Sequence, residues 1–200
     1  MRFEGEFRSA LGRGPLGTDE PAETGVDCWG GDFGCSAARV NERQMSFNSS
    51  IAAVCNRVEA MALRAKTGVC IASPDRRRLV KSVFPNLPET FQSSIKDLPM
   101  GPPYIGSCTA AMDGNTVITS HDLSTDTRFS AFFVNLCIQH GVRSLQSRPV
   151  YGRGGRPIGT FVLGYAQPRE LRDFDGALME FAADAVGALL QEELDRRLLS

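Results

Sequence analysis

The sequence has no long apolar run and no excess of positive charge, and each absence excludes a class of function. No apolar stretch approaches the roughly 20 residues of a membrane-spanning helix, and the charged, glycine-containing residues 1–17 are not typical of a signal peptide. The 22 Lys and Arg residues against 23 Asp and Glu residues give a net charge of −1, which provides no broad field for phosphate groups. We therefore expect a cytoplasmic chain that binds neither a membrane nor nucleic acid.

Signatures of catalysis and metal binding are also scarce. The only histidines, His121 and His140, stand apart, and neither a CxxC pair nor a GxSxG motif occurs. The six cysteines are scattered, which in a cytoplasmic chain favours buried thiols over disulfides. We expect no metal, no cofactor and no catalytic residues of a classical triad.

The composition itself is that of a folded protein, with 42% hydrophobic and 22% charged residues in a chain of 200, a length that suits one domain. Residues 1–40 cluster Gly, Pro, Asp and Glu without helical or strand periodicity, which predicts an irregular tail. Residues 41–200 are expected to form a single domain with a helix at each end.

The apolar spacing predicts the order of elements within that domain. They are a helix from about Met45 to Met61, a hairpin of strands 68–73 and 79–83, an irregular middle with a helical turn at 91–95, a strand in 116–123, a helix over 129–140, a hairpin of strands 142–151 and 157–166, and a final helix.

Two helix faces and two end signals complete this expectation. Phe129, Phe132 and Phe133 are assigned to one face of their helix, which Gly141 ends. Asp173 is expected to cap the last helix, whose inward stripe is Phe174, Leu178, Phe181, Ala185 and Leu189. The order predicts an α+β fold, an antiparallel sheet with the first and last helices packed together on one face.

From about Ser46 to Glu193 the sequence resembles the GAF domains of bacterial sensor kinases and cyclic-di-nucleotide enzymes. The segments that carry the resemblance are IGSCTAAMDGNTVITSHDLSTDTRF and LCIQHGVRSLQSRPVYGRGGRPIGTFVLGY. One departure is that Cys108 is followed directly by Thr109 and Ala110, where family members commonly have a further glycine. The resemblance implies that residues 41–200 are one GAF domain, with a ligand cavity on the sheet face opposite the terminal helices.

That cavity would be covered by residues 84–140, and Asp122 is interpreted as a structural residue that organises the loop Ser124–Asp126. The resemblance places the ligand between the cover and the sheet. The residues expected to bind it are Phe84, Tyr104, Ile105, Cys108, Phe129 and Phe133 from the cover, with Ser144, Gln146 and Phe161 beneath.

The function implied is that of a stand-alone sensor, which binds a small organic ligand and signals to a separate output protein through helices that also form a homodimer. Two alternatives stay open. The first is a dimerisation module without a ligand, because Leu190, Leu194 and Leu198 extend the apolar face of the last helix. The second is a free methionine-R-sulfoxide reductase that uses Cys108 and Cys137, although the segment CIQHGVRSLQSRP offers no carboxylate for the substrate's ammonium group.

Overall fold

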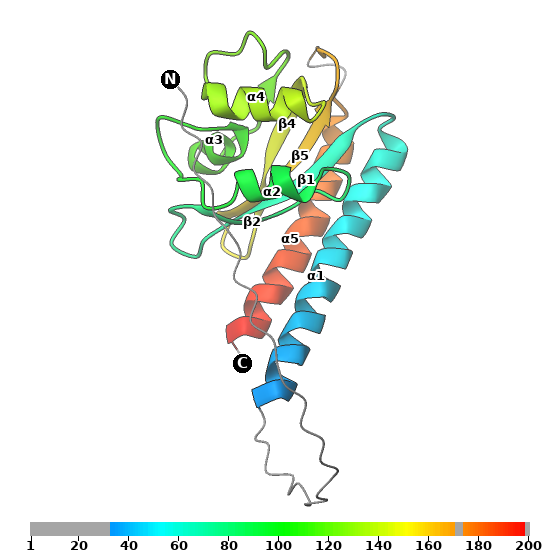
Figure 1. The fold of residues 1–200 in the computed structure, drawn as a ribbon, viewed down its shortest axis with the longest axis vertical. Coiled ribbons are helices and arrows are strands. Elements are labelled where there is room, and N and C mark those ends of the chain that lie inside the picture. Colours follow the sequence, from blue (N-terminus) through cyan, green and yellow to red (C-terminus); the bar gives the residue numbers. More distant parts are fainter. Residues whose placement is uncertain (1–32, 171–173, 199–200) are drawn as a thin grey trace, which may run out of the picture.

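The computed structural model describes residues 33–170 and 174–198. Five helices and five strands occur in this part of the chain (Figure 1). In order they are α1 (Phe33–Met61), β1 (Lys66–Ala72), β2 (Leu79–Val83), α2 (Glu89–Ser94), α3 (Ser107–Gly114), β3 (Ile118–Ser120), α4 (Ala131–Gln139), β4 (Ser144–Tyr151), β5 (Pro157–Tyr165) and α5 (Gly176–Leu198).

The strands form one antiparallel sheet in the order β2-β1-β5-β4-β3. Hairpins join β1 to β2 and β4 to β5, as the sequence predicts. Gly154 and Gly155 in the second hairpin have φ angles of 96° and 70°, which glycine adopts without a steric penalty. The central strand β5 pairs with both β1 and β4, so the two hairpins lie side by side, with β2 and β3 at the edges of the sheet.

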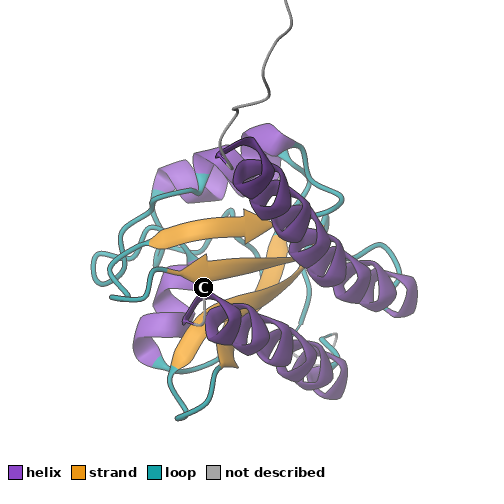
Figure 2. Cartoon of the chain, turned by 90° about the horizontal axis from the view of Figure 1, so that it is seen from below, coloured by secondary structure: helices purple, strands orange, loops and turns teal. Residues whose placement is uncertain are grey.

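Two layers of helices enclose this sheet. The long helices α1 and α5 lie side by side on one face, whereas the short helices α2, α3 and α4 lie on the other, as Figures 1 and 2 show together. We call these the helix face and the cover face. The predicted α+β class and the packing of the terminal helices on one side are confirmed.

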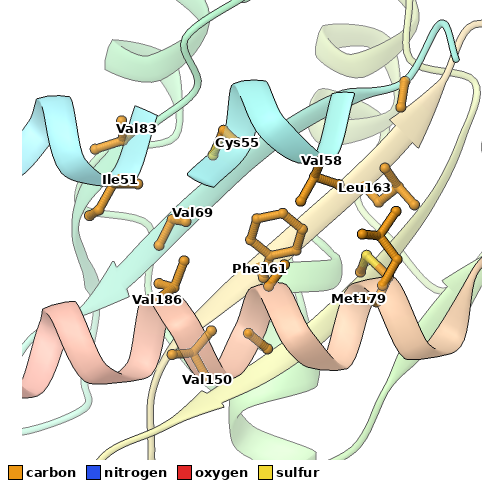
Figure 3. Close-up of a cluster of buried hydrophobic side chains, with 14 of the residues drawn as sticks. Ile51, Cys55, Val58, Val69, Val83, Val150, Phe161, Leu163, Met179 and Val186 are labelled. Carbon is orange, nitrogen blue, oxygen red and sulfur yellow. The ribbon is translucent and has the colours of Figure 1, made fainter. Parts of the chain in front are cut away.

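The helix face carries one of two hydrophobic cores. Phe161 and Leu163 of β5 point into it, between Ile51 of α1 and Val186 of α5 (Figure 3). All four side chains are fully buried. Since burying a large apolar side chain contributes about 1.5–3 kcal/mol, this core holds the two terminal helices firmly to the sheet.

The cover face carries the second core. Val162 of β5 and Leu145 of β4 contribute from the sheet, and Phe84, Phe91 and Phe133 contribute from the cover. Because β5 is buried along almost its whole length, its alternate residues supply both cores. One layer of strands therefore separates the two faces.

The helix ends correct some predictions. Helix α1 begins at Phe33 rather than near Met45, so residues 33–40 are helical, while the rest of the predicted tail lies outside the described residues. The predicted cap Asp173 lies outside them too; the Asp175 carboxylate accepts the Leu178 N–H at 2.9 Å. Gly141, with φ of 72°, ends α4 as expected.

Two predicted inward aromatic residues are in fact exposed. Phe132 of α4 is 51% exposed and Phe181 of α5 is 65% exposed, whereas their neighbours Phe133 and Ala182 are buried. The buried stripe of α5 runs through smaller residues, because helix and sheet approach closely there: a Cβ on Gly187 would lie 2.7 Å from the Tyr151 carbonyl oxygen.

Candidate ligand-binding site

Six of the predicted site residues lie together on the cover face. Phe84, Cys108, Phe129 and Phe133 belong to its buried core, and Tyr104 and Ile105 pack partly buried against it. The Tyr104 hydroxyl donates to the Asp113 carboxylate at 2.7 Å, which holds the loop before α3 against that helix. The cover predicted from the sequence is therefore assembled as one cluster.

The three predicted sheet residues lie on the opposite face. Phe161 is in the core beneath α1 and α5 (Figure 3), and Ser144 and Gln146 pair directly with Tyr165 and Leu163 of that same core. Directly paired residues share a face, so all three point away from the cover. The prediction that these three residues face the cover was therefore wrong. It was displaced by one residue along each strand, and in a strand such a displacement moves a side chain to the opposite face of the sheet.

The sheet residues under the cover are their sequence neighbours. Leu145 and Ser147 of β4 and Val162 of β5 face α3 and α4, together with Cys70 of β1. The Ser147 hydroxyl donates to the Ser107 hydroxyl at 2.9 Å, which ties β4 to the start of α3. Reading the alternation from Leu145 instead of Ser144 would have identified this face.

The cavity between cover and sheet is almost filled, with a volume of about 20 Å³. A cavity of that size holds one water molecule, whereas ligand sites are typically about 300–1,000 Å³. Two rings lie against backbone that has no side chain: a Cβ on Gly68 would overlap the Phe84 ring, and one on Gly106 would lie 2.6 Å from Phe133. A ligand enters here only if the cover moves outward.

Two buried thiols, Cys108 and Cys137, line this cavity, and a third, Cys70, lies in the same core. Cys70 hydrogen-bonds to Cys108, and this bond raises the pKa of Cys70 and lowers that of Cys108. Burial raises the pKa of Cys137 far above that of a free thiol. Among the described residues that line the cavity, Lys66 is the one charged side chain, and none is a carboxylate that could pair with a substrate's ammonium group.

A charged network fixes the loop that follows β3. The Asp122 carboxylate accepts the Ser124 N–H at 3.0 Å and pairs with Arg143, which holds its pKa well below the usual range. The predicted structural role of Asp122 is confirmed. Asp126 pairs with Arg128 at 2.6 Å, and this partner lowers the pKa of Asp126 to about 2. Both carboxylates are committed to loop geometry.

The fold and the site define a small α+β domain with a nearly filled cavity between its sheet and three short helices. The sequence pattern of the GAF domain family matches residues 39–190, and the chain belongs to this family, whose members are mostly small-molecule sensing and signalling modules. No curated protein sequence matches the chain. In the described residues, no helix is long and apolar enough to cross a bilayer.

Solved structures show the same fold at low sequence identity. A GAF domain/HD domain protein from Geobacter sulfurreducens has a TM-score of 0.55 and 14% identity, covering 74% of this chain and 94% of its own. GAF3 from Slr1393 of Synechocystis sp. PCC6803, in its photoproduct state, gives 0.53 and 14%, covering 77% and 99%.

An enzyme is among these structures. The type II free methionine-R-sulfoxide reductase from Thermoplasma acidophilum gives a TM-score of 0.54 and 17% identity, covering 74% of this chain and 94% of its own. Identities this low establish a shared fold, and the function must be argued from the site.

Proposed function

We propose that this chain is a sensor which admits a small organic ligand by outward movement of the cover, and which transmits that event to a separate protein through α1 and α5. In this proposal the chain has no catalytic role of its own. Cys55, Cys70, Cys108 and Cys137 are free and buried, which suits the reducing cytoplasm.

The observation that carries the proposal is the shared strand β5. Val162 packs into the cover core, while its neighbours Phe161 and Leu163 pack between α1 and α5. Interiors this densely packed transmit small displacements rather than absorbing them. A ligand that pushes on Val162 therefore also changes the support of both terminal helices.

Movement of the cover is favoured by its construction. Its helices have six, eight and nine residues, too short to be stable without packing against the sheet. Ser130 Oγ donates to the Ile105 carbonyl at 2.9 Å within the cover, and Arg76 Nη2 donates to the Met112 carbonyl at 2.9 Å. Backbone hydrogen bonds tie residues 97–100 of the cover to the β1–β2 hairpin. The ligand must supply the free energy of opening the cover. Its measured affinity is therefore the affinity for the open form multiplied by the fraction of protein that is open.

The test combines native mass spectrometry with hydrogen exchange. The protein is incubated with a small-molecule extract of bacterial cells, and a mass increment that disappears on denaturation reports a bound ligand. We expect that ligand to protect amides in α2–α4 and to alter exchange in α1 and α5. Phe133→Leu should change the bound fraction, while Phe132→Leu, the same substitution at an exposed neighbour, should not. Binding that leaves α1 and α5 unchanged would refute the transmission step.

A second candidate, a pairing module without a ligand, is favoured by the small cavity and by the end of α5. Leu194 is 36% exposed and Leu198 is 85% exposed, whereas Leu190 is buried in the chain's own core. Sedimentation equilibrium tests whether this surface joins two copies, since Leu198→Glu should then weaken the dimer. A dimer with no mass increment from any extract would favour this candidate over the sensor.

A further inference from the structure

A groove on the helix face, away from the cavity under the cover, is lined by residues of α1, β1, β2, β5 and α5. It has a volume of about 430 Å³, within the range of small-molecule sites. Its walls come from α1, the hairpin of β1 and β2, the start of β5 and the last turns of α5. We call it the helix groove; Figure 1 shows α1 and α5 continuing past the sheet edge that these strands form.

The helix groove combines apolar walls with charged side chains, one of which is a buried amine. Phe47, Ile158 and Leu194 supply three of its walls. The Lys81 Nζ is buried there without a hydrogen-bond partner, and it lies 5.1 Å from the centre of the Phe47 ring. Burial and the nearby Arg197 charge lower the pKa of Lys81. A buried ammonium with three unused donors is costly unless an acceptor is supplied.

The charges around the groove are mostly of one sign. Lys81, Arg76, Arg156 and Arg197 line it, against one carboxylate, Glu193. Glu193 already pairs with Arg197 at 2.8 Å, so it does not neutralise Lys81 on its own. The groove is therefore positive in a chain whose net charge is −1.

We propose that the helix groove binds an amphiphilic organic anion, with a carboxylate or phosphate head accepting hydrogen bonds from Lys81 and an apolar tail lying along Phe47, Ile158 and Leu194. An anionic acceptor satisfies the buried ammonium by a charge-assisted bond, and the apolar walls shield the tail from water. The site does not depend on the cavity under the cover. Because its walls include α1 and α5, an occupant acts directly on the packing of both terminal helices.

Isothermal titration calorimetry of the full chain with monomeric decanoate tests the proposal, with decyl phosphate in parallel and decanol as the uncharged control. We expect at least one anion to bind about tenfold or more tightly than decanol. Lys81→Met keeps the apolar stem and removes the charge, so it should abolish this preference without affecting decanol.

A matched pair of variants tests the location. Leu194→Glu places a negative charge in the groove and should weaken anion binding about tenfold, whereas Leu198→Glu, one turn further along α5, should leave it unchanged. Equal affinity for decanol and both anions, or an undiminished preference in Lys81→Met, would overturn the proposal. So would a groove filled by a second copy, seen as a dimer that Leu194→Glu dissociates and that binds neither anion.

Discussion

The two faces of the sheet are built from the same strands and yet differ in how they could admit a ligand. Under the cover, aromatic rings fill the space down to about 20 Å³, and short helices joined by loops hold them in place. On the helix face, the long helices form a firm core but leave an opening of about 430 Å³ where they pass the sheet edge. A nearly filled site under short helices must open to admit a ligand, whereas a preformed groove between long helices need not.

The cover core should tolerate truncation poorly despite its short helices. Phe133→Ala removes a buried ring that touches Gly106 and Phe129, so we expect a loss of about 3–5 kcal/mol in the free energy of unfolding. Phe132→Ala, at the exposed neighbour, should change it by less than about 0.5 kcal/mol. Urea unfolding followed by circular dichroism measures both; equal losses would place the wrong phenylalanine in the core.

On the helix face, the protein should be sensitive to an added side chain where α5 lies close to the sheet. In Gly187→Ala the new methyl would meet the Tyr151 carbonyl oxygen at 2.7 Å, so we expect a loss of about 1–3 kcal/mol despite alanine's better helix propensity. In Gly176→Ala, at the other end of α5, the methyl meets no described atom within 4 Å, and stability should be unchanged or higher. Thermal unfolding distinguishes the two, and a stabilised Gly187→Ala would contradict the close packing.

Alkylation of cysteines compares opening of the two faces directly. Cys108 lies under the cover and has a lowered pKa, whereas burial on the helix face raises the pKa of Cys55 to about 12. Iodoacetamide added to native protein should therefore modify Cys108 about tenfold or more faster than Cys55, as read from peptide masses. Comparable rates at the two thiols would mean that the faces open together.

The loop after β3 should contribute a small dependence of stability on pH. Arg128 depresses the pKa of Asp126 to about 2, so the ion pair stabilises the fold above the unfolded value near 4, and its contribution is lost as pH falls from about 4 to 2. Because Arg128 is half exposed, we expect less than about 1 kcal/mol. Urea unfolding at pH 6 and pH 3 measures this contribution to the free energy of unfolding. Asp126→Asn should reduce the difference between the two pH values, and a larger difference in the variant would refute the Asp126–Arg128 ion pair.

The order of elements could be predicted from the sequence because periodicity and turn residues record it locally. The hairpins, the end of α4 at Gly141 and the role of Asp122 followed from such signals. The face of β5 could not be assigned in the same way. A strand that is buried on both sides has no alternation of polar and apolar residues, so nothing in it distinguishes Phe161 from Val162.

Two further features depended on tertiary packing. The inward stripe of α5 follows small residues such as Ala182 and Gly187, because the helix lies close to the sheet, and Phe181 is left outside. The helix groove combines residues from α1, β2, β5 and α5, and Lys81 becomes a buried amine only once those segments meet. Contacts between segments so far apart in the sequence cannot be predicted from local spacing or from composition.

Native-state hydrogen exchange in low concentrations of urea is the most direct test of the central claim, that the cover opens while the helix face stays closed. We predict that amides of α2, α3 and α4 exchange through local openings of low free energy that urea hardly affects, and that amides of β1, β5 and α5 exchange only through global unfolding. If the cover amides instead share the free energy and urea dependence of β5, the cavity cannot admit a ligand without unfolding the domain, and the proposed sensing mechanism is contradicted.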